Sequence, residues 1–240
     1  KALDLGINFC ESASSYDRSE EYYGKALRER RKDIFLTSKS RSRTKEGALA
    51  DLQETLKSMK TDHLDLWQIH DVSDEEAMEA IFAPGGAMEA FVEAKQKGYV
   101  RFIGIGGRDD PHVIKECLER FDFDTMQVPV NPAEASCSSF LEDTISLAAE
   151  KDIGVIGMKI YVRGFTSKLT FYTSMEAFFR YALSQPIATA VIGCDTLEQL
   201  EQNVYFARSF RVMDWEEQDG FVDAIAPYAI IHYKSQYYKD

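Results

Sequence analysis

Long hydrophobic runs and an excess of basic residues are both missing from this 240-residue sequence. No apolar stretch approaches the roughly 20 residues that a membrane-spanning helix needs. Asp and Glu number 40 and Lys and Arg 28, which gives a formal net charge of −12. Because nucleic acids and anionic membrane surfaces are bound through clustered Lys and Arg, we expect neither as a partner.

Cysteine is also scarce. The four cysteines are scattered, and none belongs to a CxxC pair or to another metal-ligand spacing. They are Cys10, Cys117, Cys137 and Cys194. We therefore expect reduced thiols in a cytoplasmic protein, and no metal site. The glycine-rich GxGxxG loop of open dinucleotide-binding sheets is missing too.

What the sequence does contain is a regular alternation of strand-like and helix-like segments. Short β-branched or aromatic runs predict seven strands, at residues 7–11, 33–39, 64–70, 101–106, 125–131, 154–159 and 189–194. Amphipathic segments lie between them; residues 44–59, for example, place Leu49, Leu52, Leu56 and Met59 at steps of three and four. Such alternation is typical of parallel strands joined by right-handed crossovers.

A closed TIM (β/α)8 barrel fits this α/β pattern better than an open doubly wound sheet, which would require the missing glycine-rich loop. A barrel needs eight strands, and the sequence shows seven. The chain begins with "KALDLG" and not with Met, and this segment resembles the last turn of a helix. We therefore predict a single barrel domain over residues 1–240 whose first strand is missing from the N-terminus.

Polar residues stand where the first three predicted strands end. Glu11, Lys39 and His70 share parity with apolar residues of their strands, so period-two alternation points all three toward the mouth of the barrel. Tyr16 follows Glu11 by five residues. Because catalytic residues of (β/α)8 barrels lie at the carboxyl ends of the strands, these four are the candidate catalytic residues.

Together the four side chains suit proton transfer to a carbonyl oxygen. A phenol has a pKa near 10 and is a weak acid at pH 7, but a nearby lysine cation favours the phenolate and lowers that pKa. In this interpretation Tyr16 is the general acid, Lys39 lowers its pKa, and Glu11 orients Lys39. His70 donates a hydrogen bond to the substrate carbonyl. The hydride must come from a cofactor.

Each of the four residues also has an ordinary structural interpretation. Lys39 could be a lysine at the barrel rim, His70 a satisfied histidine, and Tyr16 merely one of 12 tyrosines. Glu11 could cap the next helix or pair with Arg18. The hypothesis therefore rests on four suitable residue types arriving together on consecutive strands.

Six segments, in order along nearly the whole chain, resemble motifs of the aldo-keto reductase superfamily. "NFCESASSYDRSEEYYG" resembles "NFxDTAxxYGxxE", "FLTSK" resembles the lysine strand, and "TDHLDLWQIH" resembles "DYIDLxxxH". "GYVRFIGIGG", "MQVPVN" and "SQPIATAVIGCDTLEQLEQNV" resemble "GKIRxIGxSN", "xQVPYN" and "VIxGxxxxEQLEEN". The resemblance implies a TIM barrel that reduces an aldehyde or ketone with NADPH or NADH, without metal. It also implies that Tyr16, Lys39, His70 and Glu11 are the catalytic tetrad.

This sequence departs from the family pattern at two places. The family's aspartate is Glu11 here, which keeps the acid but is one methylene longer. The family's "SN" pair, which holds the carboxamide of the nicotinamide, is Gly106–Gly107 here.

The resemblance also implies a set of cofactor-binding residues in the second half of the chain. Gln127 would contact the nicotinamide carboxamide, and Met158 takes the place of the aromatic residue that often stacks on the nicotinamide. Thr196 and Gln199 are predicted to form a capping box at the start of the last cofactor helix. The cofactor-binding candidates are Gln127, Met158, Lys159, Gly193, Asp195, Thr196, Gln199 and Asn203.

The charge of the last cofactor segment bears on the choice between NADP and NAD. Relatives that prefer NADPH hold its 2′-phosphate with Lys or Arg near this helix start, whereas this chain has Asp195, Glu198 and Glu201. Acids repel a phosphate and can accept a hydrogen bond from a ribose 2′-OH, so we expect NADH preference or weakened NADPH binding. Basic residues that could supply the missing charge instead are Arg163, Lys168 and Arg208.

Two further functions stay open on the sequence. A barrel that binds the nucleotide without turnover, as a regulatory or scaffold subunit, is kept open by Glu11 and by Gly106–Gly107. A Schiff-base aldolase would use Lys39 or Lys159 as its nucleophile. The loops after the strands carry no signature of a particular carbonyl substrate or of an oligomeric state.

Overall fold

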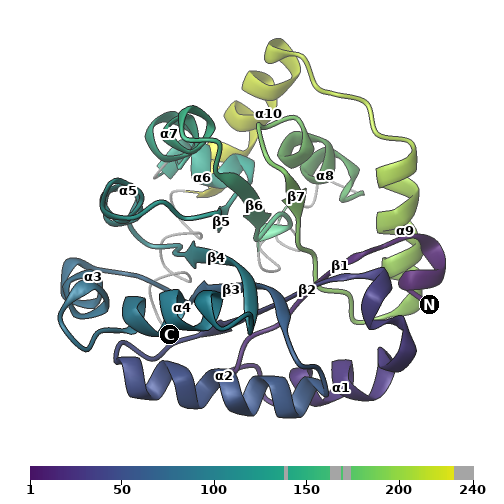
Figure 1. Cartoon of the computed structure of the whole chain (residues 1–240). Helices are drawn as coiled ribbons and strands as arrows, with labels where there is room; N and C mark the ends of the chain where they lie inside the picture. Colours follow the sequence, from purple (N-terminus) through teal and green to yellow (C-terminus); the bar gives the residue numbers. More distant parts are fainter. Residues whose placement is uncertain (138–139, 163–168, 170–173, 230–240) are drawn as a thin grey trace. The chain divides into compact units, whose positions relative to one another are not determined.

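Strands and helices alternate along the whole described chain (Figure 1). The computed structural model describes residues 1–137, 140–162, 169 and 174–229. Contacts divide the chain into two compact units, one of residues 1–108 with 116–125 and one of residues 109–115 with 126–240. All seven predicted strands are present.

The first unit is built on four parallel strands that neighbour one another in chain order. These are β1 (Phe9–Glu11), β2 (Phe35–Ser40), β3 (Leu64–Ile69) and β4 (Val100–Gly106). Its helices include α1 (Ser19–Ala26), α2 (Lys45–Met59), α3 (Glu75–Phe82) and α4 (Ala87–Gln96), with 3-10 turns at Leu3–Leu5 and Arg28–Asp33. Helix α2 lies between α1 and α4 (Figure 1), and Thr44 caps it by accepting from the amide of Gly47.

Strand β2 is buried although its second half is polar. The hydroxyl of Ser38 donates to Glu20 of α1 at 2.6 Å, and that of Ser40 donates to Asp51 of α2 at 2.5 Å. Because side chains alternate along a strand, Lys39 points to the opposite side from these two serines. The helices therefore satisfy one side of β2 and leave Lys39 available at the other.

The apolar core of the first unit contains an aromatic stack between a strand and a helix. Trp67 of β3 and Phe91 of α4 are fully buried, and their ring centroids lie 3.7 Å apart with planes at 13°. Large buried aromatic rings dominate the energetics of such cores. This stack fixes β3, whose carboxyl end carries His70, against α4.

The second unit contains β5 (Thr125–Pro129, from Met126 onward), β6 (Gly154–Met158) and β7 (Thr189–Ala190), and β6 pairs with β7 in parallel. Its further elements are α6 (Pro132–Cys137), a π-helical turn (Leu141–Ile145), α7 (Ser146–Glu150), α8 (Glu176–Leu183), α9 (Leu197–Arg208) and α10 (Trp215–Tyr228). Helix α5 (Pro111–Arg120) is divided between the two units after Lys115. Strand β7 ends earlier than the predicted Cys194, because after Val191, which donates to the carbonyl of Gly157, the chain turns toward the cap of α9.

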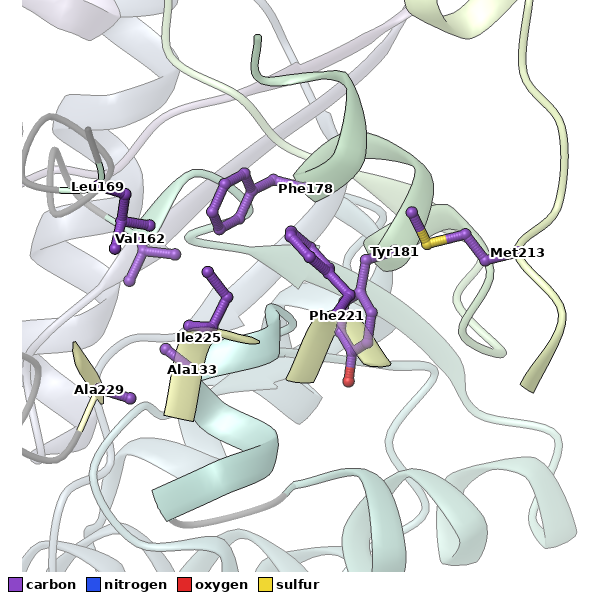
Figure 2. Packing of buried hydrophobic residues seen from close by; sticks show 9 residues of the cluster. All are labelled: Ala133, Val162, Leu169, Phe178, Tyr181, Met213, Phe221, Ile225 and Ala229. Carbon is purple, nitrogen blue, oxygen red and sulfur yellow. The ribbon is translucent and has the colours of Figure 1, made fainter. Parts of the chain in front are cut away.

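A cluster of buried apolar residues holds the helices of the second unit together (Figure 2). Phe178 of α8 meets Phe221 of α10 edge to face, with centroids 5.0 Å apart and planes at 73°. Ile225 and Tyr181 pack beside them. Within the described residues, no helix combines the length and the apolar character that crossing a bilayer demands.

Replacing Phe91 with Ala should destabilise the first unit strongly. The substitution removes the ring that stacks on Trp67 and leaves a cavity, so we expect a loss of about 3–5 kcal/mol in the free energy of unfolding. Urea unfolding followed by tryptophan fluorescence measures this. Tyr22→Ala, at a ring of α1 that is 57% exposed, is the control and should cost about 1 kcal/mol or less. Equal losses for the two variants would contradict the assignment of the Trp67–Phe91 stack to the core of the first unit.

Candidate active site

A buried ion pair joins the ends of β1 and β2. Lys39 is only 3% exposed, and its ammonium pairs with the carboxylate of Glu11 and donates to the carbonyl of Ser12 at 2.9 Å. Because an unpaired buried ammonium would be very costly, this pairing holds Lys39 charged and in place. The alternative partner Arg18 pairs instead with Glu21 at 3.0 Å. Helix α1 has no side-chain cap, so Glu11 does not serve as one.

Tyr16 is carried to this pair by a segment that continues the pairing of β1 with β2. The amides of Ser12 and Ser14 donate to the carbonyls of Thr37 and Lys39, each at 3.0 Å. The Lys39 ammonium nitrogen then lies 4.9 Å from the centroid of the Tyr16 ring. Tyr16 is 41% exposed, so a substrate can reach its side chain while the lysine beneath it is covered.

His70 joins the same cluster from the end of β3. Its backbone amide donates to the carbonyl of Ser40 at 2.9 Å, which ties the ends of β2 and β3 together. Its ring meets that of Tyr16 edge-on, with centroids 5.5 Å apart and planes at 82°. Its Nδ1 lies 3.5 Å from the hydroxyl oxygen of Ser15. The structure thus brings together all four predicted catalytic residues in one unit.

One residue that supports this cluster was not singled out from the sequence. The guanidinium of Arg43 donates to the carbonyl of His70 at 2.9 Å and to that of Asp71 at 2.6 Å. Asp71 has a φ of +59°, a left-handed conformation that side chains disfavour unless their surroundings hold it. Arg43 therefore fixes the backbone turn that aims His70. Its only sequence signal is the "SRSR" run that begins at Ser40, the last residue of β2.

A buried carboxylate anchors α1 to the face of β2 that is opposite to the Lys39 side chain. Glu20 accepts hydrogen bonds from Ser38 at 2.6 Å and from Thr55 at 2.9 Å. Burial raises the pKa of Glu20, outweighing the two hydrogen bonds that lower it. Tyr16 lies just before α1, so holding α1 against β2 also helps to fix the position of Tyr16 relative to Lys39.

The predicted cofactor residues all lie in the second unit. Gln127 is buried in β5, and Met158 is the last residue of β6. Lys159 follows with a φ of +57°, and its carbonyl accepts from the side-chain amide of Asn131 at 3.2 Å. Gly106 takes the place of the serine of the family's "SN" pair, which holds the nicotinamide carboxamide. It is the last residue of β4, in the first unit, and has only backbone groups to offer.

The start of α9 carries the remaining predicted cofactor residues, and they are solvent-accessible. Thr196 caps the helix by accepting from the amide of Gln199 at 3.3 Å. In the predicted capping box the Gln199 side chain would accept from the amide of Thr196. It accepts instead from the amide of Asp195, one residue earlier, at 2.7 Å. Asn203 accepts from the hydroxyl of Tyr161 at 2.5 Å. Gly193 is exposed beside this turn.

The acidic residues at this helix start, Asp195, Glu198 and Glu201, are also exposed. Hydrogen bonds from its own backbone amide and from Thr196 lower the pKa of Glu198. Of the alternative cations, Arg208 lies at the end of α9, whereas Arg163 and Lys168 lie outside the described residues. Among the described side chains, no group of three or more His, Cys, Asp or Glu is arranged to hold a metal ion.

Comparison with known proteins agrees with this architecture. The family model described as the aldo/keto reductase family matches residues 1–171. An uncharacterized oxidoreductase of Bacillus subtilis, YqkF, is 28% identical over 90% of this chain and 83% of its own length. The holo form of an aldo-keto reductase from Bacillus halodurans superposes with a TM-score of 0.76 at 25% identity, over 93% of this chain and 84% of that one.

A third similar protein shares the fold. An aldo-keto reductase from Klebsiella pneumoniae, solved in complex with NADPH, has a TM-score of 0.75 at 18% identity, over 94% of this chain and 82% of that one. These likenesses, with seven strands that alternate with helices, confirm the predicted (β/α)8 fold class.

The raised pKa of Glu20 makes a prediction about stability and pH. A carboxyl whose pKa is higher in the folded state favours folding at low pH, and that contribution is lost as the pH rises through the folded pKa. Glu20→Gln should therefore become more stable relative to the wild type between pH 4 and pH 7. Urea unfolding at both pH values measures this, with the exposed Glu29→Gln as control. A pH-independent difference for Glu20→Gln would contradict the raised pKa.

Proposed function

Because this chain belongs to the aldo/keto reductase family, we propose that it is an oxidoreductase that reduces an aldehyde or ketone to an alcohol with a nicotinamide cofactor. The observation that carries this proposal is the buried Lys39 ammonium, which Glu11 and the Ser12 carbonyl hold 4.9 Å from the centroid of the Tyr16 ring. An ammonium held there stabilises a phenolate, which is what a tyrosine becomes when it has donated its proton.

The chain's own residues would manage the proton and the orientation of the substrate. A bound nicotinamide supplies hydride to the carbonyl carbon. As the carbonyl oxygen gains the electron pair of the C=O bond, it takes the proton of Tyr16, and Lys39 stabilises the phenolate that remains. His70 orients the carbonyl through a hydrogen bond from its ring. Water then returns a proton to Tyr16.

The cofactor residues in the second unit fit a nicotinamide dinucleotide in their chemistry. Gln127 offers an amide for the nicotinamide carboxamide, and the capped N-terminus of α9 offers backbone N–H groups of the kind that bind phosphate. The exposed acids Asp195, Glu198 and Glu201 around that helix start favour NADH over NADPH in this proposal.

Tyr16→Phe tests the assignment of the general acid. We expect it to lower kcat/KM for 4-nitrobenzaldehyde by about 10²–10⁴-fold, because the phenolic proton is lost while the ring stays in place. Following the oxidation of NADH or NADPH by absorbance measures the rate. Tyr22→Phe, at an exposed tyrosine of α1, should leave the rate unchanged.

Three other outcomes would contradict the reductase mechanism. Turnover by Tyr16→Phe at the wild-type rate would remove Tyr16 as the acid. Nucleotide binding without reduction of any aldehyde would favour a scaffold subunit. Trapping of a lysine adduct by borohydride with a carbonyl substrate would favour a Schiff-base aldolase.

The acidic start of α9 predicts the order of cofactor affinities. Titration with NADH and NADPH, followed by quenching of Trp67 and Trp215 fluorescence, should give a lower Kd for NADH. Asp195→Asn removes one exposed charge and should improve NADPH binding relative to NADH by about 2–5-fold. A Kd for NADPH well below that for NADH in the wild type would contradict this part of the proposal.

A further inference from the structure

A chain of hydrogen bonds runs through the side chain of Asn203 in the second unit. The hydroxyl of Tyr161 donates to Oδ1 of Asn203 at 2.5 Å, and Nδ2 of Asn203 donates to Sγ of Cys194 at 3.2 Å. The thiol of Cys194 in turn donates to the carbonyl of Ile192, with sulfur and oxygen 3.9 Å apart. We call Tyr161, Asn203 and Cys194 the amide clamp. Its members come from the segment after β6, from α9 and from the segment that leads into α9.

The direction of these hydrogen bonds is set at both ends of the chain. A carbonyl can only accept, so the thiol of Cys194 donates to Ile192 and its sulfur accepts from the nitrogen of Asn203. At the other end, 2.5 Å suits an O–H···O bond and is too short for N–H···O, so Oδ1 of Asn203 is the atom that faces Tyr161. Burial raises the pKa of Tyr161, which favours the protonated form that donates. The amide of Asn203 is therefore held in one of its two flips.

The clamped amide keeps an acceptor and a donor for a ligand. An amide oxygen has two lone pairs and an amide nitrogen two N–H groups, and the contacts with the described residues use one of each. Asn203 is half-buried and Cys194 beside it is exposed, so the amide lies at the surface of the unit. An acceptor held next to a donor matches the edge of adenine that presents the N6 amino group beside N7.

The amide clamp lies on the helix whose start offers N–H groups to a cofactor phosphate in the proposed function. The helical rise places Asn203 about 10 Å along α9 from its cap, Thr196. Gln199 and Asn203 are four residues apart and share one face of this helix. Their side chains bond to Asp195 and Cys194, in the segment that leads into the helix. A nucleotide whose phosphate binds at the helix start would extend along this face and bring its base to Asn203.

We propose that Tyr161 is a positioning residue that fixes the flip of the Asn203 amide, so that the cofactor site selects adenine over hypoxanthine as the base of the dinucleotide. This inference rests on the proposed function, because it concerns the cofactor of the same reaction. Hypoxanthine presents an oxygen where adenine presents its N6 amino group, and that oxygen would meet another acceptor, Oδ1 of Asn203. An amide that is free to turn over would donate to this oxygen and would accept both bases.

A matched pair of cofactors tests the proposal. NADH and reduced nicotinamide hypoxanthine dinucleotide differ in the base alone, where an oxygen replaces the N6 amino group. Calorimetry on the wild type should give a Kd for NADH that is lower by about ten-fold or more, because a bidentate amide pair discriminates by that amount. Tyr161→Phe keeps the ring and removes the hydroxyl. It should reduce the ratio of the two Kd values to about three-fold or less, mainly by weakening NADH.

Variants at Cys194 and Tyr205 are the matched controls. Cys194→Ser keeps an acceptor for the Asn203 amide and should keep the ratio, whereas Cys194→Ala removes the acceptor and should lower it. Tyr205→Phe removes the hydroxyl of an exposed ring on the same helix and should leave both Kd values unchanged. Urea unfolding of each variant checks that the fold is kept. A general loss of structure would weaken both cofactors together and leave their ratio unchanged.

Two results would overturn the proposal. One is an equal Kd for the two cofactors in the wild type, and the other is an unchanged ratio in Tyr161→Phe. Equal weakening of both cofactors by Tyr161→Phe belongs to the second result and would leave Tyr161 a purely structural role.

Binding by calorimetry requires no aldehyde, so the outcome is separate from that of the reductase proposal. Discrimination between the two cofactors without reduction of any aldehyde would support the amide clamp and contradict the reductase mechanism. Reduction of an aldehyde with the same kcat/KM for both cofactors would support the reductase and overturn the role of Tyr161. Failure of both cofactors to bind would overturn both proposals.

Discussion

The ion pair between Lys39 and Glu11 is the interaction on which the rest of the site depends. An ammonium that is 3% exposed carries a large desolvation cost, which a carboxylate and a backbone carbonyl at the ends of two neighbouring strands offset. The family's aspartate is replaced by Glu11, and the longer side chain still reaches Lys39. Glu11 is one of the two departures that keep a non-catalytic interpretation open, and it leaves the pairing with Lys39 intact.

The surrounding structure serves to keep that pair in place. Ser38 and Ser40 turn toward the acids of α1 and α2, so Lys39 is left facing the other way. Backbone hydrogen bonds then tie each strand end to the next. The amide of Ser14 donates to the carbonyl of Lys39 in β2, that of His70 to Ser40 in β2, and that of Val72 to Gly106 in β4. Chemistry that needs several side chains within a few ångströms is therefore positioned by main-chain hydrogen bonds, which do not depend on which substrate is bound.

Much of this arrangement could be predicted from the sequence, for identifiable reasons. Strand ends follow from short apolar runs, and period two along those runs placed Glu11 and Lys39 on one side. The predicted end of β7 was wrong. The apolar residues that follow the two-residue strand resemble its continuation in sequence, although they lead to the cap of α9. The support that Arg43 gives to the turn after His70 was not predicted, because arginines in loops are common and the left-handed conformation of Asp71 leaves no signal in the sequence.

The measurement that tests the account most directly is single-turnover transfer of deuterium from 4-deuterated cofactor to an aldehyde, in the wild type and in Glu11→Gln/Lys39→Met. The double variant keeps the size of both side chains, removes both charges and leaves no unpaired buried ion. The account predicts label at the carbinol carbon in the wild type and a rate lower by about 10²-fold or more in the variant. Transfer at the wild-type rate in a folded variant would show that the ammonium beside Tyr16 has no part in the reaction.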